Sequence, residues 1–154
     1  MKEKNLLFKN AINFSENVDF NFISKLLNRN NFESHISSNW LNVYVLNSVF
    51  KITGVQKDPF FEDLYLKMNR DYNIEKIQSD LFIFMSMKIG GVSITHKDEY
   101  EVIIIGGFGK TLYIVEDEEY YVNPGDILKI PKNYTHTALG ITPRIIFSYG
   151  KYNN

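Results

Sequence analysis

The stretches Gly90–Lys110, GGVSITHKDEYEVIIIGGFGK, and Asn123–Gly140, NPGDILKIPKNYTHTALG, decide the fold of this 154-residue chain. Both consist of short apolar and β-branched runs that end at Gly, Pro, Asn or Asp, which is the pattern of short strands joined by turns. They also hold two of the three histidines, His96 and His136. The pattern therefore predicts a small β-barrel that carries both histidines.

The same pattern extends outward from these stretches and predicts eight short strands after Ser79. They are Leu81–Lys88, Val92–His96, Tyr100–Gly106, Lys110–Glu116, Glu119–Val122, Ile127–Ile130, Tyr134–Leu139 and Arg144–Tyr149. Eight short antiparallel strands can close as a double-stranded β-helix, the barrel of the cupin and jelly-roll kind. A barrel of this size is lined by side chains and can hold one small ligand at its mouth.

The first half of the chain predicts helices that cover the barrel. Asp19 is a good helix cap, and the apolar residues after it recur at helical spacing for about three turns. Pro59–Met68 has the same period, with acids in its first turn. Trp40–Thr53 predicts one or two strands. We expect one mainly β domain over 1–154, with an N-terminal extension (1–78) packed on a barrel core (79–150).

A candidate metal site follows from the spacing of the histidines. His96 and Asp98 occupy alternate positions of an extended run, so their side chains face the same way. His136 lies forty residues later, beyond turns that reset the strand direction. Two imidazoles and one carboxylate on facing strands are the ligand set that holds Fe(II) with open positions. Those positions would admit a co-substrate and dioxygen together.

These residues occur in an order and at separations that are typical of one family. The set comprises His96-Lys97-Asp98, Tyr100, Val102–Ile105, Gly109 with the basic residue after it, Pro124–Pro131, and His136. It resembles the core of the JmjC-type, cupin-like oxygenases, most of all the bacterial ribosomal-protein hydroxylases, over about residues 81–150. The resemblance implies Fe(II), 2-oxoglutarate as co-substrate, and hydroxylation of an unactivated C–H bond. The implied substrate is a peptide or protein side chain, with small molecules as the other option.

The chain departs from the family where the co-substrate binds. In the family, a Lys or Arg two residues after the glycine at Gly109 pairs with the distal carboxylate of 2-oxoglutarate, and here Thr111 stands there. Ser93 matches a hydroxyl that assists in some relatives. Two other bases are available: Lys110, if a bulge turns its side chain inward, and Arg144. A hydroxyl alone binds a carboxylate weakly, so without a repositioned base we expect low affinity for 2-oxoglutarate.

Two alternatives remain open. Glu101 follows His96 by the five residues that separate ligands in ordinary metal cupins, although it runs straight into an apolar strand, which favours Asp98. The second alternative concerns function. Thr111 is also compatible with a metal cupin that does not use 2-oxoglutarate, either a dioxygenase or an isomerase. It is equally compatible with a degenerate cupin that serves as a binding or sensor domain.

Composition bounds the remaining functions. With 17 basic and 18 acidic residues, no single-sign field favours nucleic acid or an anionic membrane. The absence of cysteine excludes disulfides and thiolate sites, and with no long apolar run it predicts a cytoplasmic protein. His35 is expected in an exposed loop, and the acidic residues 116–119 at a solvated hairpin tip. The aromatic first half could support a homodimer.

Overall fold

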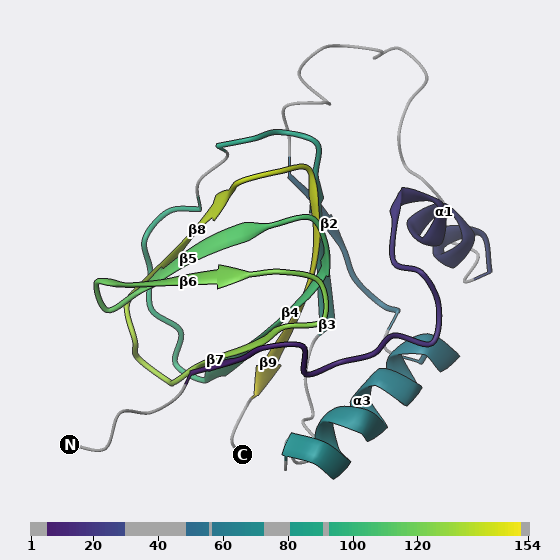
Figure 1. The fold of residues 1–154 in the computed structure, drawn as a ribbon, viewed down its shortest axis with the longest axis horizontal. Coiled ribbons are helices and arrows are strands. Elements are labelled where there is room, and N and C mark those ends of the chain that lie inside the picture. Colours follow the sequence, from purple (N-terminus) through teal and green to yellow (C-terminus); the bar gives the residue numbers. More distant parts are fainter. Residues whose placement is uncertain (1–5, 30–48, 56, 73–80, 91–92, 152–154) are drawn as a thin grey trace.

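The computed structural model describes residues 6–29, 49–55, 57–72, 81–90 and 93–151. Two antiparallel sheets and two helices make up this part of the chain (Figure 1). The larger sheet has the order β1-β7-β4-β9-β3-β2 and the smaller one β6-β5-β8. The strands are β1 Leu7–Phe8, β2 Phe50–Ile52, β3 Leu81–Ser86, β4 Glu101–Phe108, β5 Thr111–Val115, β6 Glu118–Val122, β7 Ile127–Ile130, β8 His136–Gly140 and β9 Arg144–Lys151. This arrangement confirms the expected double-stranded β-helix.

The larger sheet is apolar on both faces and therefore separates two cores. Val102 and Ile104 of β4 pack toward the smaller sheet, in a cluster with Tyr113 and Val115 of β5. Ile103 and Ile105 face the opposite way, because successive side chains of a strand alternate, and they join the core beneath the helices. The continuous run Val102–Ile105 is thus explained by burial on both faces, and the helices cover one side of the sheet (Figure 1).

Two helices, α1 (Phe20–Arg29) and α3 (Pro59–Tyr72), confirm the helical predictions. Asp19 caps α1 by accepting a hydrogen bond from the Phe22 amide at 2.8 Å. The buried Asp58 caps α3, since its Oδ1 accepts from the Phe60 amide at 3.0 Å. Arg29 reaches from the end of α1 to both carboxylate oxygens of Asp58, at 2.7 and 2.8 Å. This bidentate pair joins the two helices.

One predicted strand, Val92–His96, is not a regular strand. Its described residues lie along β8, with amide to carbonyl bonds from Gly90 to Gly140, from Ser93 to Ala138 and from His96 to His136. Each step covers three residues on this segment but two on β8, so a regular ladder cannot form. Between Ser93 and His96 the chain turns outward, and the Ile94 side chain is 87% exposed. Among the described residues 93–96 of this segment, His96 alone forms a β-bridge, to His136.

The N-terminal half differs from expectation in one further place. No strand was predicted before residue 40, but Leu7 and Phe8 form β1 beside Leu128 and Ile127 of β7. A two-residue strand is too short to give a periodic pattern. Of the Trp40–Thr53 prediction, β2 is present, and the rest lies outside the described residues, as does His35. Among the described residues, no helix has the length and apolar content needed to cross a bilayer.

The buried Asp126 fastens β1 to the barrel, and its removal gives a testable prediction. Burial alone raises the pKa of Asp126, but hydrogen bonds from Lys9, Asn10 and Asn123 outweigh burial and hold the pKa below its ordinary value. We expect Asp126→Asn to lower the free energy of unfolding at neutral pH by about 1–3 kcal/mol. Because the pKa of Asp126 is lower in the folded than in the unfolded protein, its carboxylate stabilises the fold at pH values above the unfolded pKa, and this stabilisation is lost in acid. Urea titrations should therefore show the difference in unfolding free energy between wild type and variant shrinking below about pH 4. A difference that stays constant with pH would contradict this role.

Candidate metal centre

The two histidines are held side by side by their own backbones. The His96 amide donates to the His136 carbonyl at 3.0 Å, and the His136 amide returns the bond to the His96 carbonyl at 2.9 Å. Residues directly opposite in an antiparallel pair project from the same face. The two rings accordingly lie with their centroids 4.3 Å apart. Register between distant segments, rather than local sequence, brings the imidazoles together.

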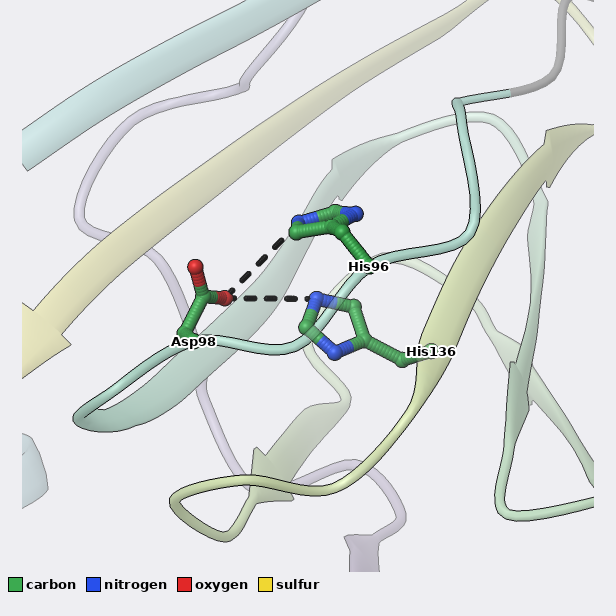
Figure 2. Close-up of side chains that lie close together, drawn as sticks. All are labelled: His96, Asp98 and His136. Carbon is green, nitrogen blue, oxygen red and sulfur yellow. Dashed lines mark ion pairs between the residues drawn. The ribbon is translucent and has the colours of Figure 1, made fainter.

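Asp98 completes a group of three residues that could hold a metal ion. It lies two residues after His96 and so points to the same side. Its Oδ2 is 3.8 Å from His96 Nε2 and 3.4 Å from His136 Nε2 (Figure 2). One ligand atom from each of the three residues lies within 4.8 Å of the others. The Asp98 carbonyl also accepts a bond from the Asn133 amide at 2.8 Å, where Asn133 takes a left-handed conformation (φ 64°), which fixes this segment against the turn before β8.

Hydrogen bonds set the tautomer of both rings. His96 Nδ1 lies 2.7 Å from the Ile94 carbonyl, and His136 Nδ1 lies 3.1 Å from the Tyr134 carbonyl. A carbonyl oxygen only accepts, so each Nδ1 carries the proton. In its neutral form, each ring would then direct the lone pair of Nε2 toward Asp98. Backbone carbonyls orient metal-ligating histidines in this way.

The donor set fits a divalent metal ion. Two Nε2 lone pairs and a carboxylate oxygen converge, and such a group needs a cation between them, either a proton or a metal. His136 is 6% exposed whereas His96 is largely exposed, so one side of the group is open to incoming ligands. Two imidazoles and one carboxylate on one face are the facial triad of non-haem Fe(II) enzymes. The structure thus brings together the three residues that the sequence selected as ligands.

The group lies at a cavity of about 430 Å³ between the two sheets, within the range of small-molecule sites. Aromatic and aliphatic side chains line most of it, including Phe82 and Phe84 of β3. The ammonium of Lys51 lies 3.7 Å from the Phe82 ring centroid. No pattern in the sequence predicted this wall, because Lys51 and Phe82 come together only through the pairing of β2 with β3.

Of the other residues that the sequence analysis considered, some line the cavity and others do not. Ser93 lines the cavity, and its hydroxyl accepts from the Ala138 amide at 2.8 Å. Thr111 lines it too, with a buried hydroxyl that has no hydrogen-bond partner among the described residues. Lys110 is not part of the lining, and its ammonium lies 4.6 Å from the Tyr121 ring. Glu101 begins β4 opposite Lys151 and stands outside the ligand group.

Of the two basic side chains that line the cavity among the described residues, Arg144 is buried whereas Lys51 is exposed. Arg144 opens β9 opposite Ser86 of β3, is 7% exposed, and donates from Nη1 to the Lys88 carbonyl at 2.8 Å. Burial lowers the pKa of Arg144, and the nearby Tyr113 opposes part of that change. Burial likewise raises the pKa of Tyr113, so the phenol keeps its proton. A guanidinium remains charged even so.

Comparison with solved structures assigns the architecture. The chain has the fold shared by cupins and cupin-like 2-oxoglutarate oxygenases: a cupin superfamily protein from Desulfitobacterium hafniense superposes with a TM-score of 0.53 at 12% identity, covering 77% of this chain and 94% of that one. No family model and no curated protein sequence matches the chain.

YcfD, a ribosomal oxygenase from Escherichia coli, is another protein whose structure is similar. Its structure matches with a TM-score of 0.66 at 20% identity, covering 96% of this chain and 48% of that one. Its complex with cobalt and succinic acid gives a TM-score of 0.70 at the same identity and coverage. Its complex with cobalt and 2-oxoglutarate gives 0.50 at 25% identity, covering 60% of this chain and 29% of that one. The chain thus spans about half the length of the YcfD chains it matches.

Proposed function

We propose that this chain is an Fe(II)- and 2-oxoglutarate-dependent oxygenase of the JmjC type. The observation that carries the proposal is the convergence of His96, Asp98 and His136 at the cavity between the two sheets. The complexes of YcfD with cobalt and either 2-oxoglutarate or succinic acid support a metal and a 2-oxo acid in this fold. We take the metal to be Fe(II), because two imidazoles and a carboxylate leave positions open for both co-substrate and dioxygen.

The side chains divide the work of such a reaction. His96, Asp98 and His136 would hold the ion, which when bound supplies the dioxygen activation that couples conversion of 2-oxoglutarate to succinate and CO₂ with hydroxylation of a C–H bond. The Ile94 and Tyr134 carbonyls keep both rings oriented. The apolar walls from β3 and β4 exclude water from the cavity, which strengthens the electrostatic contacts inside.

We propose a peptide or protein side chain as the substrate. YcfD is described as a ribosomal oxygenase, and here Phe82, Phe84 and Lys51 form an aromatic and cationic wall on the cavity. Such a wall fits a side chain inserted from outside. The acidic hairpin tip between β5 and β6 is not part of the cavity lining, so it provides no specific argument for a basic peptide.

Succinate formation tests the proposal, and paired carboxylate variants sharpen the test. The purified chain, given Fe(II), 2-oxoglutarate, ascorbate and oxygen, should form succinate, faster with a suitable peptide. We expect Asp98→Asn to lower that rate by more than about 100-fold, since mutating a residue that only hydrogen-bonds to a metal ligand already lowers activity about 10–100-fold. The matched variant Glu101→Gln should retain the rate, because Glu101 stands outside the ligand group.

The outcomes of this assay separate the candidate functions. Loss of succinate formation in Glu101→Gln but not in Asp98→Asn would reverse the ligand assignment. Metal retained after purification without any succinate formation would favour the second candidate, a metal cupin that does not use 2-oxoglutarate. The observation favouring that candidate is Thr111 in place of the family's basic residue. No retained metal would favour a binding or sensor domain.

A further inference from the structure

We propose that Arg144, together with the hydroxyl of Thr111, binds the distal carboxylate of 2-oxoglutarate and so takes the place of the base that the family carries at the Thr111 position. The inference rests on the proposed function. It moves the cationic contact from β5 to β9, on the opposite sheet. Four observations support it: the path of the Arg144 side chain, its distance in register from Thr111, the state of the Thr111 hydroxyl, and the charge of the cavity.

The path of Arg144 depends on a glycine. A Cβ placed on Gly140 would lie 1.8 Å from Arg144 Nη1 and 2.4 Å from Cζ, which no real side chain could tolerate. The guanidinium therefore passes directly over the backbone of β8 at Gly140, and this carries it from the larger sheet to the smaller one. Arg144 is at the same time a lining residue of the cavity. Its charged end thus lies between the sheets rather than in solvent.

Thr111 lies next to the same point. It is directly opposite Gly140 in the pairing of β5 with β8. Opposite residues in an antiparallel pair have side-chain positions about 5 Å apart, so the Thr111 side chain and the guanidinium over Gly140 are neighbours. Tyr113, two residues further along the same face of β5, is close enough to Arg144 for the two to affect each other's pKa. The three residues form one polar patch in the cavity wall.

The Thr111 hydroxyl points to a ligand. It is buried, and it has no hydrogen-bond partner among the described residues. Leaving a buried donor without a partner is costly, and native structures rarely do so without a functional reason. The residue faces the cavity, so a carboxylate beside Arg144 would accept the missing bond. The same carboxylate would meet a charged and a neutral donor from opposite sheets.

The charge of the cavity selects the same kind of ligand. Among the residues that the structure describes, its lining has two cationic side chains, Lys51 and Arg144, and one carboxylate, Asp98, which faces the histidines. The cavity is therefore positive before a divalent ion adds two further charges. A dicarboxylic 2-oxo acid, with its oxo acid end at the metal and its distal carboxylate at Arg144, would balance that charge. A 2-oxo acid without the distal carboxylate would not.

Calorimetry on the Co(II)-loaded protein tests the assignment with a pair of ligands. 2-Oxoglutarate and 2-oxopentanoate share the oxo acid end and chain length, but the second has a methyl group where the first has its distal carboxylate. The wild-type protein should bind 2-oxoglutarate at least about 10-fold more tightly, since hydrogen bonds between charged groups are worth that much. Arg144→Met should remove this preference by weakening 2-oxoglutarate about 10- to 100-fold while leaving 2-oxopentanoate unchanged.

Three further variants isolate the cause. Arg144→Lys keeps the charge and should recover part of the preference. Thr111→Val removes the hydroxyl at constant shape and should weaken 2-oxoglutarate by about 3- to 10-fold. Lys110→Met is the matched control, because it deletes the other candidate base, whose ammonium lies over Tyr121 rather than in the cavity. It should bind both ligands as the wild type does.

Each other outcome overturns the assignment in an identifiable way. If Arg144→Met retains the preference, or if Lys110→Met loses it, the anchor is elsewhere. If Arg144→Met weakens both ligands equally, the residue acts only through its bond to the Lys88 carbonyl. If the wild-type protein binds cobalt but no 2-oxoglutarate, the proposed function fails along with the anchor, whereas binding that Arg144→Met does not alter leaves the function standing.

Discussion

His136→Ala is expected to lower the affinity for Co(II) or Fe(II) by more than about 100-fold, because loss of an outer partner alone costs 10–100-fold and this change removes a ligand. His136 is the most buried of the three ligand residues, and its ring is fixed by the Tyr134 carbonyl. The remaining pair, His96 and Asp98, comes from one short segment and can hold an ion at only two points. Titration of the metal-free protein by calorimetry, and metal content after dialysis, measure the effect.

Misfolding must be separated from loss of the ligand. The His136 backbone pairs with His96 whatever the side chain, so the fold should persist. We expect thermal unfolding in the presence of EDTA to be nearly the same for His136→Ala and wild type. The remaining histidine, at position 35, provides the control substitution to alanine, which should leave metal binding intact. A His136→Ala protein that binds metal like the wild type would mean that the three side chains do not form a metal centre.

Phe147→Ala should cost about 3–5 kcal/mol of unfolding free energy, the usual range for truncating a buried aromatic side chain. Phe147 lies at the centre of β9 and is fully buried. Its ring packs against four others, with centroids 5.2 Å away for Phe61, 5.9 Å for Phe60, 6.1 Å for Phe14 and 6.4 Å for Phe22. The ring therefore joins the larger sheet to both helices, and its loss leaves a cavity that the rigid sheet cannot close.

Chemical denaturation monitored by circular dichroism measures this effect. Leu66→Ala on α3 is the matched control, because Leu66 is 63% exposed and surface substitutions stay within about 0.5 kcal/mol. The ligand group lies on the other face of the larger sheet, so the folded fraction of Phe147→Ala should still bind metal. A loss below about 1 kcal/mol would show that the helices are not held to the sheet through this ring.

Local patterns predicted much of the fold. Helical spacing and the cap at Asp19 placed α1, and the turn residues placed seven of the eight predicted strands. The segment Val92–His96 was wrong as a regular strand because its bonds to β8 advance three residues for every two on the partner. That mismatch is a property of the pair and leaves no trace in either sequence. β1 was missed because two residues give no period.

The sequence by itself determined the kinds of chemistry available: two imidazoles, a carboxylate two residues from one of them, and a set of short strands able to form a barrel. Tertiary structure decided which groups meet. The pairing of His96 with His136 brought Asp98, and not Glu101, beside the two rings, and the pairing of Thr111 with Gly140 brought Thr111 beside the Arg144 guanidinium, while Lys110 lies outside the cavity lining. Strand register determines which of these side chains lie close together, and register depends on contacts between segments far apart in the chain.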